Sequence, residues 1–309
     1  MNINWKGVYP AVTTKFTADD ELDIKTTALG LKAQLDAGVH GIVLGGTLGE
    51  ASTLTVEEKE KLMEISLETA AQKVPVLMNI AEQSTADAIK AAHKAEDFGV
   101  DGLMMLPPMR YFSDHRETVQ YFSDVASSTG LPIMIYNNPV DYKIEVTIDM
   151  FEELKKFNNI QAVKESTRDT TNITRMRNAF GDRYKILCGV DTLALESLLL
   201  GADGWVAGLV CAFPKETVAI YNLVQQGKVE DALTIYKWFM PLLELDIHPK
   251  LVQNIKLAES LTGLGTEHVR KPRLPLVGEE RERVLQIIEN GIETRPTLPV
   301  SQPATITSN

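Results

Sequence analysis

A lysine stands at the end of a short apolar run, Ile160-Gln161-Ala162-Val163-Lys164, that predicts a buried strand. Burying an unpaired ammonium is costly, so such a group is paired, hydrated or shifted in its pKa. Only the neutral amine attacks a carbonyl or imine carbon. Lys164 is therefore a candidate Schiff-base nucleophile, and the alternative is a structural lysine paired with an acid such as Glu165.

Tyr136 occupies the matching position at the end of the preceding apolar run. Period-two alternation places Ile160, Ala162 and Lys164 on one strand face, which we interpret as the inner face. Side chains on neighbouring strands lie about 5 Å apart, so the phenol and the amine could share one substrate. Tyr136 is a candidate proton relay whose pKa a nearby positive charge would lower. The alternative is a tyrosine bonded to backbone.

A glycine-rich turn follows the second apolar run, in Gly45-Gly46-Thr47-Leu48-Gly49-Glu50. Glycines let the backbone approach a ligand, and successive N–H groups form a nest for a carboxylate. Thr47 adds a hydroxyl donor. The turn matches neither a Walker loop nor the dinucleotide fingerprint. The alternative is a strand-to-helix turn that needs glycine geometry.

Later in the chain, Cys188-Gly189-Val190-Asp191 ends another run. Gly189 permits close approach of a ligand, Asp191 is interpreted as a cap of the next helix, and Cys188 as a core residue. The five histidines have no metal-ligand spacing, so we expect no metal.

The bulk composition narrows the possible partners. The formal charge of −11 over 309 residues disfavours nucleic acid and anionic membranes. No signal peptide or membrane-spanning run is evident. Two cysteines cannot build a disulfide framework, which favours a cytoplasmic location.

Eight short apolar runs alternate with helical patterns, and they read as parallel strands covered on both faces. This repetition predicts a (β/α)₈ barrel in preference to an open doubly wound sheet. The eight predicted strands are Val8–Phe16, Gly41–Gly46, Val74–Ala81, Gly102–Pro107, Pro132–Pro139, Ile160–Ser166, Tyr184–Val190 and Gly204–Leu209.

Beyond the eighth run the pattern becomes helical. Helices are predicted over Pro214–Gln226, Val229–Phe239, Pro249–Leu261 and Glu279–Asn290. We expect a barrel over residues 1–226, a C-terminal helical extension over 227–292 and a disordered tail over 293–309.

Three motifs together resemble the dihydrodipicolinate synthase / N-acetylneuraminate lyase family, and they occur in the expected order: Gly46-Thr47-Leu48-Gly49-Glu50, Tyr136-Asn137-Asn138-Pro139 and Val163-Lys164-Glu165-Ser166. The resemblance implies a barrel with a helical extension, a homotetramer built as a dimer of dimers, and a lysine Schiff base with no cofactor or metal. It implies Lys164, Tyr136 and Thr47 as catalytic residues. It also implies that Gly46, Thr47, Leu48, Gly189 and Val206 bind the substrate.

Three departures separate the chain from the synthases of this family. Leu48 replaces a second threonine, Asp141 stands where the synthases carry an arginine, and Met109 lies where they supply a tyrosine across the dimer interface. The chain is similar instead to the branch that acts on 1-pyrroline-4-hydroxy-2-carboxylate in hydroxyproline breakdown, although that branch often has histidine at the position of Glu244. The segments that carry this likeness are Leu106–Tyr111, Gly189–Asp191, Trp238–Leu243 and Pro249–Gln253.

The sequence thus predicts a deaminase that converts a small anionic imino acid to 2-oxoglutarate semialdehyde. The alternatives are a dehydratase or aldolase for 2-keto-3-deoxy sugar acids, a pyruvate-dependent synthase, and a catalytically silent barrel that binds a keto acid. Residues that could read the substrate hydroxyl are Arg110, Tyr111, Asp141 and Tyr142.

Overall fold

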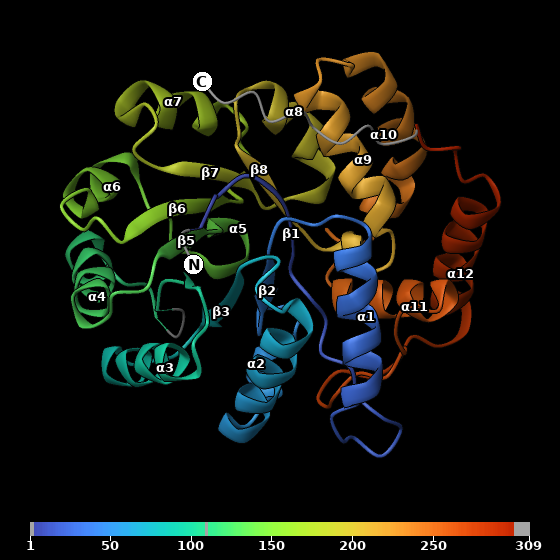
Figure 1. Ribbon diagram of the computed structural model, residues 1–309, viewed down its shortest axis with the longest axis horizontal. Coiled ribbons are helices and arrows are strands. Elements are labelled where there is room, and N and C mark those ends of the chain that lie inside the picture. The colour runs from blue at the N-terminus through green and yellow to red at the C-terminus, as the bar shows by residue number, and fades with distance from the viewer. Residues whose placement is uncertain (1–2, 109–110, 300–309) are drawn as a thin grey trace.

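Eight parallel strands form the centre of the protein, in a computed structural model that describes residues 3–108 and 111–299 (Figure 1). Seven ladders join them in the order β1-β8-β7-β6-β5-β4-β3-β2, and a parallel bridge from Ala11 to Val43 connects β1 to β2. The predicted (β/α)₈ barrel is confirmed. The strands are β1 (Gly7–Pro10), β2 (Ile42–Leu44), β3 (Val76–Ile80), β4 (Gly102–Met105), β5 (Ile133–Asn137), β6 (Ile160–Glu165), β7 (Lys185–Cys188) and β8 (Gly204–Ala207).

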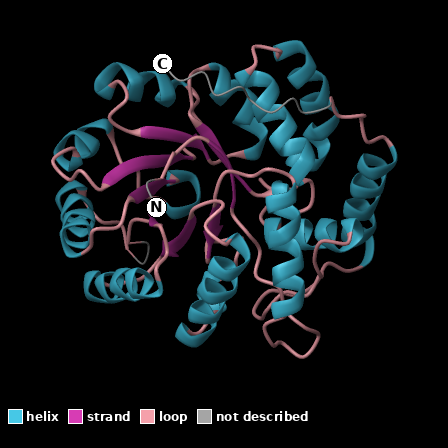
Figure 2. Ribbon diagram, in the orientation of Figure 1, coloured by secondary structure: helices cyan, strands magenta, loops and turns pink. Residues whose placement is uncertain are grey.

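Helices surround the strands, and the last three gather with α9 and α1 on one side of the barrel (Figure 2). The helices of the barrel are α1 (Ile24–Asp36), α2 (Val56–Ala70), α3 (Thr85–Phe98), α4 (His115–Ser128), α5 (Pro139–Tyr142), α6 (Ile148–Leu154), α7 (Thr171–Phe180), α8 (Ala194–Leu199) and α9 (Pro214–Gln225). The C-terminal helices are α10 (Val229–Leu243), α11 (Leu251–Thr262) and α12 (Gly278–Glu293).

Helix starts follow the sequence signals. Thr55 accepts a hydrogen bond from the N–H of Glu58, whose carboxylate in turn accepts from the N–H of Thr55, and the two bonds form a capping box at the start of α2. Ser84 caps α3 in the same way by accepting from the N–H of Asp87. These local bonds set where each helix leaves its strand.

The buried side chains divide into two apolar clusters. The larger cluster lies between the strands and their helices, and the smaller one contains the barrel interior, including Tyr9, Met134, Ala162 and Val206. Ile160, expected on the inner face with Ala162, belongs to the larger cluster instead. The β5–β6 register skips Gln161, and this bulge shifts the alternation by one residue.

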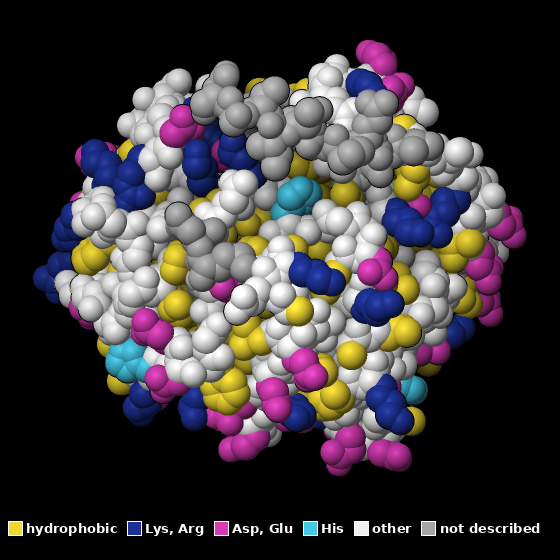
Figure 3. Space-filling view, in the orientation of Figure 1, with side chains coloured by type: hydrophobic (Ala, Val, Ile, Leu, Met, Phe, Trp, Pro, Cys, Tyr) yellow, Lys and Arg dark blue, Asp and Glu magenta, His cyan; other side chains and the backbone are white. Residues whose placement is uncertain are grey.

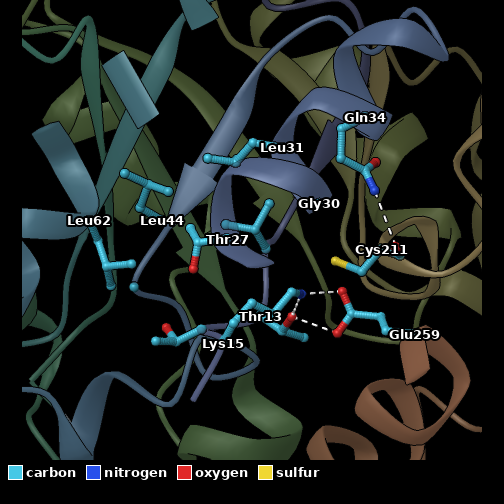
Figure 4. Close-up of a pocket in the computed structure, with 13 residues that line it drawn as sticks. Thr13, Lys15, Thr27, Gly30, Leu31, Gln34, Leu44, Leu62, Cys211 and Glu259 are labelled. Carbon is cyan, nitrogen blue, oxygen red and sulfur yellow. Dashed lines mark hydrogen bonds and ion pairs between the residues drawn. The ribbon is translucent and has the colours of Figure 1, made fainter. Parts of the chain in front are cut away.

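The first strand is shorter than predicted. It ends at Pro10, and two of the polar residues that follow, Thr13 and Lys15, bond to the C-terminal helix α11. Lys15 forms an ion pair with Glu259 of α11, and Thr13 donates to the same carboxylate at 2.7 Å (Figure 4). A second buried pair joins Lys256 of α11 to Glu50. Two ion pairs therefore tie α11 to the loops after β1 and β2.

The end of the chain is placed only in part. Arg295 donates to Glu216 of α9, and Leu298 packs against the larger apolar cluster. The rest of the predicted tail, 300–309, lies outside the described residues. The division at residues 226 and 292 remains a prediction.

Candidate active site

Lys164 and Tyr136 are register partners on β6 and β5. The Lys164 ammonium nitrogen Nζ lies 4.0 Å from the centre of the Tyr136 ring, and each residue is 7% exposed. Glu165 does not pair with the lysine, because its carboxylate accepts from the N–H of Thr167 and from the side-chain amide of Asn172. Within the described part of the chain, no hydrogen bond or ion pair joins the side-chain amine of Lys164 to another group.

Burial is the largest influence on the pKa of this amine. It lowers the pKa of Lys164, and the acidic groups around it, led by Tyr142 and followed by Asp246 and Asp191, offset only part of that effect. A neutral amine is thereby favoured relative to a solvent-exposed lysine. This is the state that nucleophilic attack on carbon requires.

The Tyr136 phenol differs from the expectation in one respect. Its pKa is raised to about 12, mainly by burial, rather than lowered by a nearby charge. The carboxyl groups of Asp141 and Asp246 also raise it, and the hydrogen bond from Asn138 lowers it only in part. The side-chain amide of Asn138 donates to the phenol at 3.1 Å and to Asp141 at 2.7 Å. Tyr136 therefore starts as a proton donor, not as a phenolate.

A second tyrosine, Tyr142, joins this group. It lies on the short helix α5, which was not among the helices predicted from the sequence. The Tyr142 hydroxyl is hydrogen-bonded to the Thr47 hydroxyl, and its ring meets that of Tyr136 edge to face at 5.6 Å. Burial raises the pKa of Tyr142. Thr47, Tyr142 and Tyr136 thus bring three hydroxyl groups to one side of Lys164.

The glycine-rich turn after β2 presents free backbone donors. No acceptor among the described residues takes the N–H groups of Gly46, Thr47 or Leu48. A Cβ added at Gly46 would only reach ordinary contact with Met104, at 3.7 Å, so the space beside this backbone is open. The Leu48 side chain packs into the larger cluster, which leaves its backbone to face the cavity. Such a nest suits a carboxylate.

Gly189 and Val206 line the same cavity as Lys164. A Cβ at Gly189 would lie 2.6 Å from two carbons of the Lys164 side chain and would overlap the Ser166 hydroxyl. Glycine is thus required there by the lysine itself. Val206 is buried in the inner cluster and forms part of the floor. The structure brings together in one cavity the residues predicted as catalytic or substrate-binding, namely Gly46, Thr47, Leu48, Tyr136, Lys164, Gly189 and Val206.

Three ionisable residues that line the cavity extend this set. Asp141 was a candidate from sequence, whereas Arg168 and Asp246 were missed. Arg168 and Asp141 approach to 3.8 Å, and both are well exposed. Asp246 comes from the α10–α11 loop, and no sequence signal distinguishes it from a surface acid. Of the other hydroxyl-reading candidates, Tyr111 is 53% exposed and does not line the cavity, and Arg110 lies outside the described residues, as does Met109.

Asp191 does not cap the following helix, contrary to expectation. Its buried carboxylate accepts from the indole of Trp205 at 2.8 Å and from the N–H groups of Gly208 and Leu209. It therefore fixes the loop after β8 beneath the cavity. Cys188 is a buried core residue as expected, and burial raises the pKa of its thiol to about 12.

Other features of the described residues carry less chemistry. The cavity beside Thr13, Lys15 and Glu259 (Figure 4) has about 20 Å³ of space, enough for about one water molecule, against about 70 Å³ beside Lys164.

No group of three or more His, Cys, Asp or Glu residues within 3–108 and 111–299 is placed to hold a metal ion. No described helix is long and apolar enough to span a bilayer. The face in Figure 3 carries charges of both signs.

Comparison with known proteins agrees with this site. A sequence model described as the dihydrodipicolinate synthetase family matches residues 4–291. The chain is 31% identical to the 4-hydroxy-tetrahydrodipicolinate synthase of Exiguobacterium sibiricum, covering 92% of this chain and 96% of that protein. It is 30% identical to 4-hydroxy-tetrahydrodipicolinate synthase 1 of Halalkalibacterium halodurans, with the same coverage. The solved structure of the synthase from Methylacidiphilum fumariolicum SolV superposes with a TM-score of 0.89 at 29% identity, over 93% of this chain and 96% of that one. The chain belongs to the dihydrodipicolinate synthetase family.

Proposed function

We propose that this protein is a Schiff-base lyase of its family that deaminates 1-pyrroline-4-hydroxy-2-carboxylate to 2-oxoglutarate semialdehyde. The observation that carries the proposal is a buried, unpaired Lys164 beside Tyr136, in a cavity whose mouth holds Asp141 and Asp246. The substrate has one carboxylate, and its ring opening creates an amine that becomes cationic. The anion nest complements the carboxylate, and the Asp141 carboxylate complements the cationic amine.

The reaction begins with attack of the neutral Lys164 amine on C2 of the ring imine. The ring nitrogen then leaves C2 as an amine on C5, and the substrate stays bound as a protonated lysine imine. That cationic imine draws electrons from C3. The Tyr136 hydroxyl gives its proton to the departing ring nitrogen, and the resulting phenolate, assisted by Thr47, removes the C3 proton. The N–H groups at Gly46 and Thr47 would hold the carboxylate throughout.

The resulting enamine expels the C4 hydroxyl as water. Proton shifts then move the unsaturation to C5, giving a terminal imine. Two further waters hydrolyse this imine and the lysine imine, which releases ammonia, the keto aldehyde and free Lys164. The net change is one water consumed and one ammonia released per substrate.

A second candidate is a pyruvate-dependent condensation, as the names of the relatives suggest. Arg168 favours it, because this cation at the cavity mouth could bind the carboxylate of a second substrate. Its pairing with Asp141 and the presence of Leu48 weigh against it. Dehydration or cleavage of a 2-keto-3-deoxy sugar acid would use the same lysine.

A substrate panel separates these functions. The protein is given pyruvate with an aldehyde, a 2-keto-3-deoxy acid, or the hydroxypyrroline carboxylate, and each reaction is assayed for product and trapped with borohydride. Ammonia release with the last compound alone, with the reduced adduct mapped to Lys164, supports the deaminase. Turnover of another member selects that activity instead, and no adduct with any member indicates a silent binding barrel.

The lysine is tested directly by Lys164→Met. Ammonia release should fall by more than about a thousandfold and borohydride labelling should vanish. Lys237→Met, at an exposed site on α10, is the matched control and should behave as wild type. Normal turnover by the Lys164 variant contradicts the proposal.

Family membership also leads us to propose a homotetramer arranged as a dimer of dimers. The two buried free cysteines accord with a reducing, cytoplasmic environment, which we propose on that ground.

A further inference from the structure

Asp246 is a carboxyl group in the cavity that the proposed roles of Lys164, Tyr136 and Thr47 leave unused. It lines the cavity together with Lys164. Within residues 3–108 and 111–299, no hydrogen bond or ion pair joins its side chain to another group. Neighbouring acids differ in this respect, since Asp191 accepts hydrogen bonds from three donor groups and Asp141 accepts one from Asn138. Asp246 is thus held in place without a protein partner.

Packing brings this carboxyl against the end of β8. A Cβ added at Gly208 would overlap the Asp246 oxygen Oδ1, so the carboxyl rests directly on the glycine backbone. Around the barrel, Tyr136 stands on β5, Lys164 on β6 and Gly208 follows β8. Two proton-carrying groups therefore flank the lysine on opposite sides. A substrate bound to Lys164 would lie between them.

We propose that Asp246 is the general acid that protonates the C4 hydroxyl as it leaves the lysine-bound enamine. This inference rests on the proposed function, because it assigns a group to its elimination step. Hydroxide is a poor leaving group near neutral pH, so the departing oxygen needs a proton. Tyr136, already engaged with C3 on the other side of the lysine, would not have to serve both carbons.

The surroundings favour the protonated form of this carboxyl. Burial raises the pKa of Asp246 well above its ordinary value, and Asp191 beneath it and Asp141 at the mouth act in the same direction. The basic groups that face it, Lys164 and Arg168, lower this pKa and offset the rise only in part. The arrangement matches a neutral acid beside a neutral amine.

The step balances without any further reagent. The enamine nitrogen pushes its electron pair toward C2, the C3–C4 double bond forms, and the C4–O bond breaks. The oxygen takes the Asp246 proton and leaves as water. The neutral enamine becomes a conjugated iminium cation, and the carboxylic acid becomes a carboxylate, so total charge is unchanged. The Asp246 carboxylate can then accept the C5 proton during the shift to the terminal imine.

The test compares two leaving groups in Asp246→Asn, a variant of nearly the same shape. Ammonia release from the hydroxy substrate should fall about a hundredfold or more, the usual effect of losing a general acid. The 4-fluoro analogue should be far less affected, within about fivefold by fluoride release, because fluoride leaves without prior protonation. Borohydride trapping and exchange of the C3 proton in deuterated water should stay near the wild-type level. Glu244→Gln, exposed in the same segment, is the charge-matched control.

Equal losses with both leaving groups would overturn the assignment, since they indicate damage to the site rather than a missing proton. Undiminished ammonia release would overturn it too. If the wild-type protein releases no ammonia, the proposed function is wrong, yet the C4 hydroxyl of a 2-keto-3-deoxy acid leaves by the same elimination and gives the same comparison. If neither substrate undergoes elimination, both the proposed function and the role of Asp246 are wrong.

Discussion

At the scale of single residues, the main chemical question is whether Lys164 or Asp246 carries the proton that they could share. Burial acts on Lys164 and Asp246 in opposite directions, lowering the pKa of the amine and raising that of the acid. Both effects favour the neutral pair over an ion pair in the free site. Tyr136 stays protonated as well, with a pKa of about 12. The directions of these shifts therefore favour a free site with one nucleophile and two proton donors.

This distribution predicts a bell-shaped pH profile for kcat/KM of ammonia release. The rate rises with pH as Lys164 loses its proton, because only the amine attacks, and the lowered pKa brings this limb below the usual lysine range. It falls at higher pH as Asp246 loses the proton that the leaving hydroxyl needs. In the Asp246→Asn variant, the rise of the rate at lower pH should remain. The fall at higher pH should shift toward the pKa of Tyr136, about 12.

Ionisation of the substrate affects the wild type and the Asp246→Asn variant equally. A difference between their pH profiles therefore comes from the protein. A falling limb at the same pH in wild type and variant would show that another group controls it. The titratable and charged groups that face Asp246 are Lys164, Asp191, Asp141 and Arg168, and Asp191 would then be the next to examine.

At the scale of elements, α11 connects the helical extension to the loops that form the site. Lys256 on this helix pairs with Glu50, the residue that ends the glycine-rich turn, and both side chains are fully buried. Glu50 also accepts from the N–H of Arg270 at 3.0 Å. The burial of Lys256 lowers its pKa to about 8 in spite of this partner. The pair thus positions the turn more than it stabilises the fold.

Lys256→Met should nevertheless destabilise the protein by about 3–5 kcal/mol, because it leaves the Glu50 carboxylate buried without its main counter-charge. Urea unfolding measures this free energy. Adding Glu50→Gln removes the orphaned charge and should restore part of the loss. Lys32→Met, which breaks an exposed pair with Asp36 on α1, should change stability by less than about 1 kcal/mol. A Lys256 variant as stable as that control would show that the pair is dispensable.

For the whole molecule, the strands were predictable because parallel strands buried on both faces read as continuous apolar runs. Their end residues, Lys164 and Tyr136, followed from the barrel rule that reactive groups lie at strand ends. The bulge at Gln161 was not predictable, because a pairing shift leaves no mark in an apolar run. Asp246 was missed because only tertiary packing brings the α10–α11 loop over Gly208.

The number of chains in the assembled protein is a property of the whole molecule that is measured in solution. Tyr111 and Phe112, which follow β4, are 53% and 77% exposed, and a second copy of the chain that covered them would bury apolar surface. We expect light scattering to give four chains of 34.2 kDa, about 137 kDa. Phe112→Asp should lower that mass, because an interface would have to bury its charge. Val277→Asp, at a similarly exposed site before α12, should leave the mass unchanged. Dissociation by the second variant alone would place the interface at the helical extension, and a monomeric wild type would contradict the expected assembly.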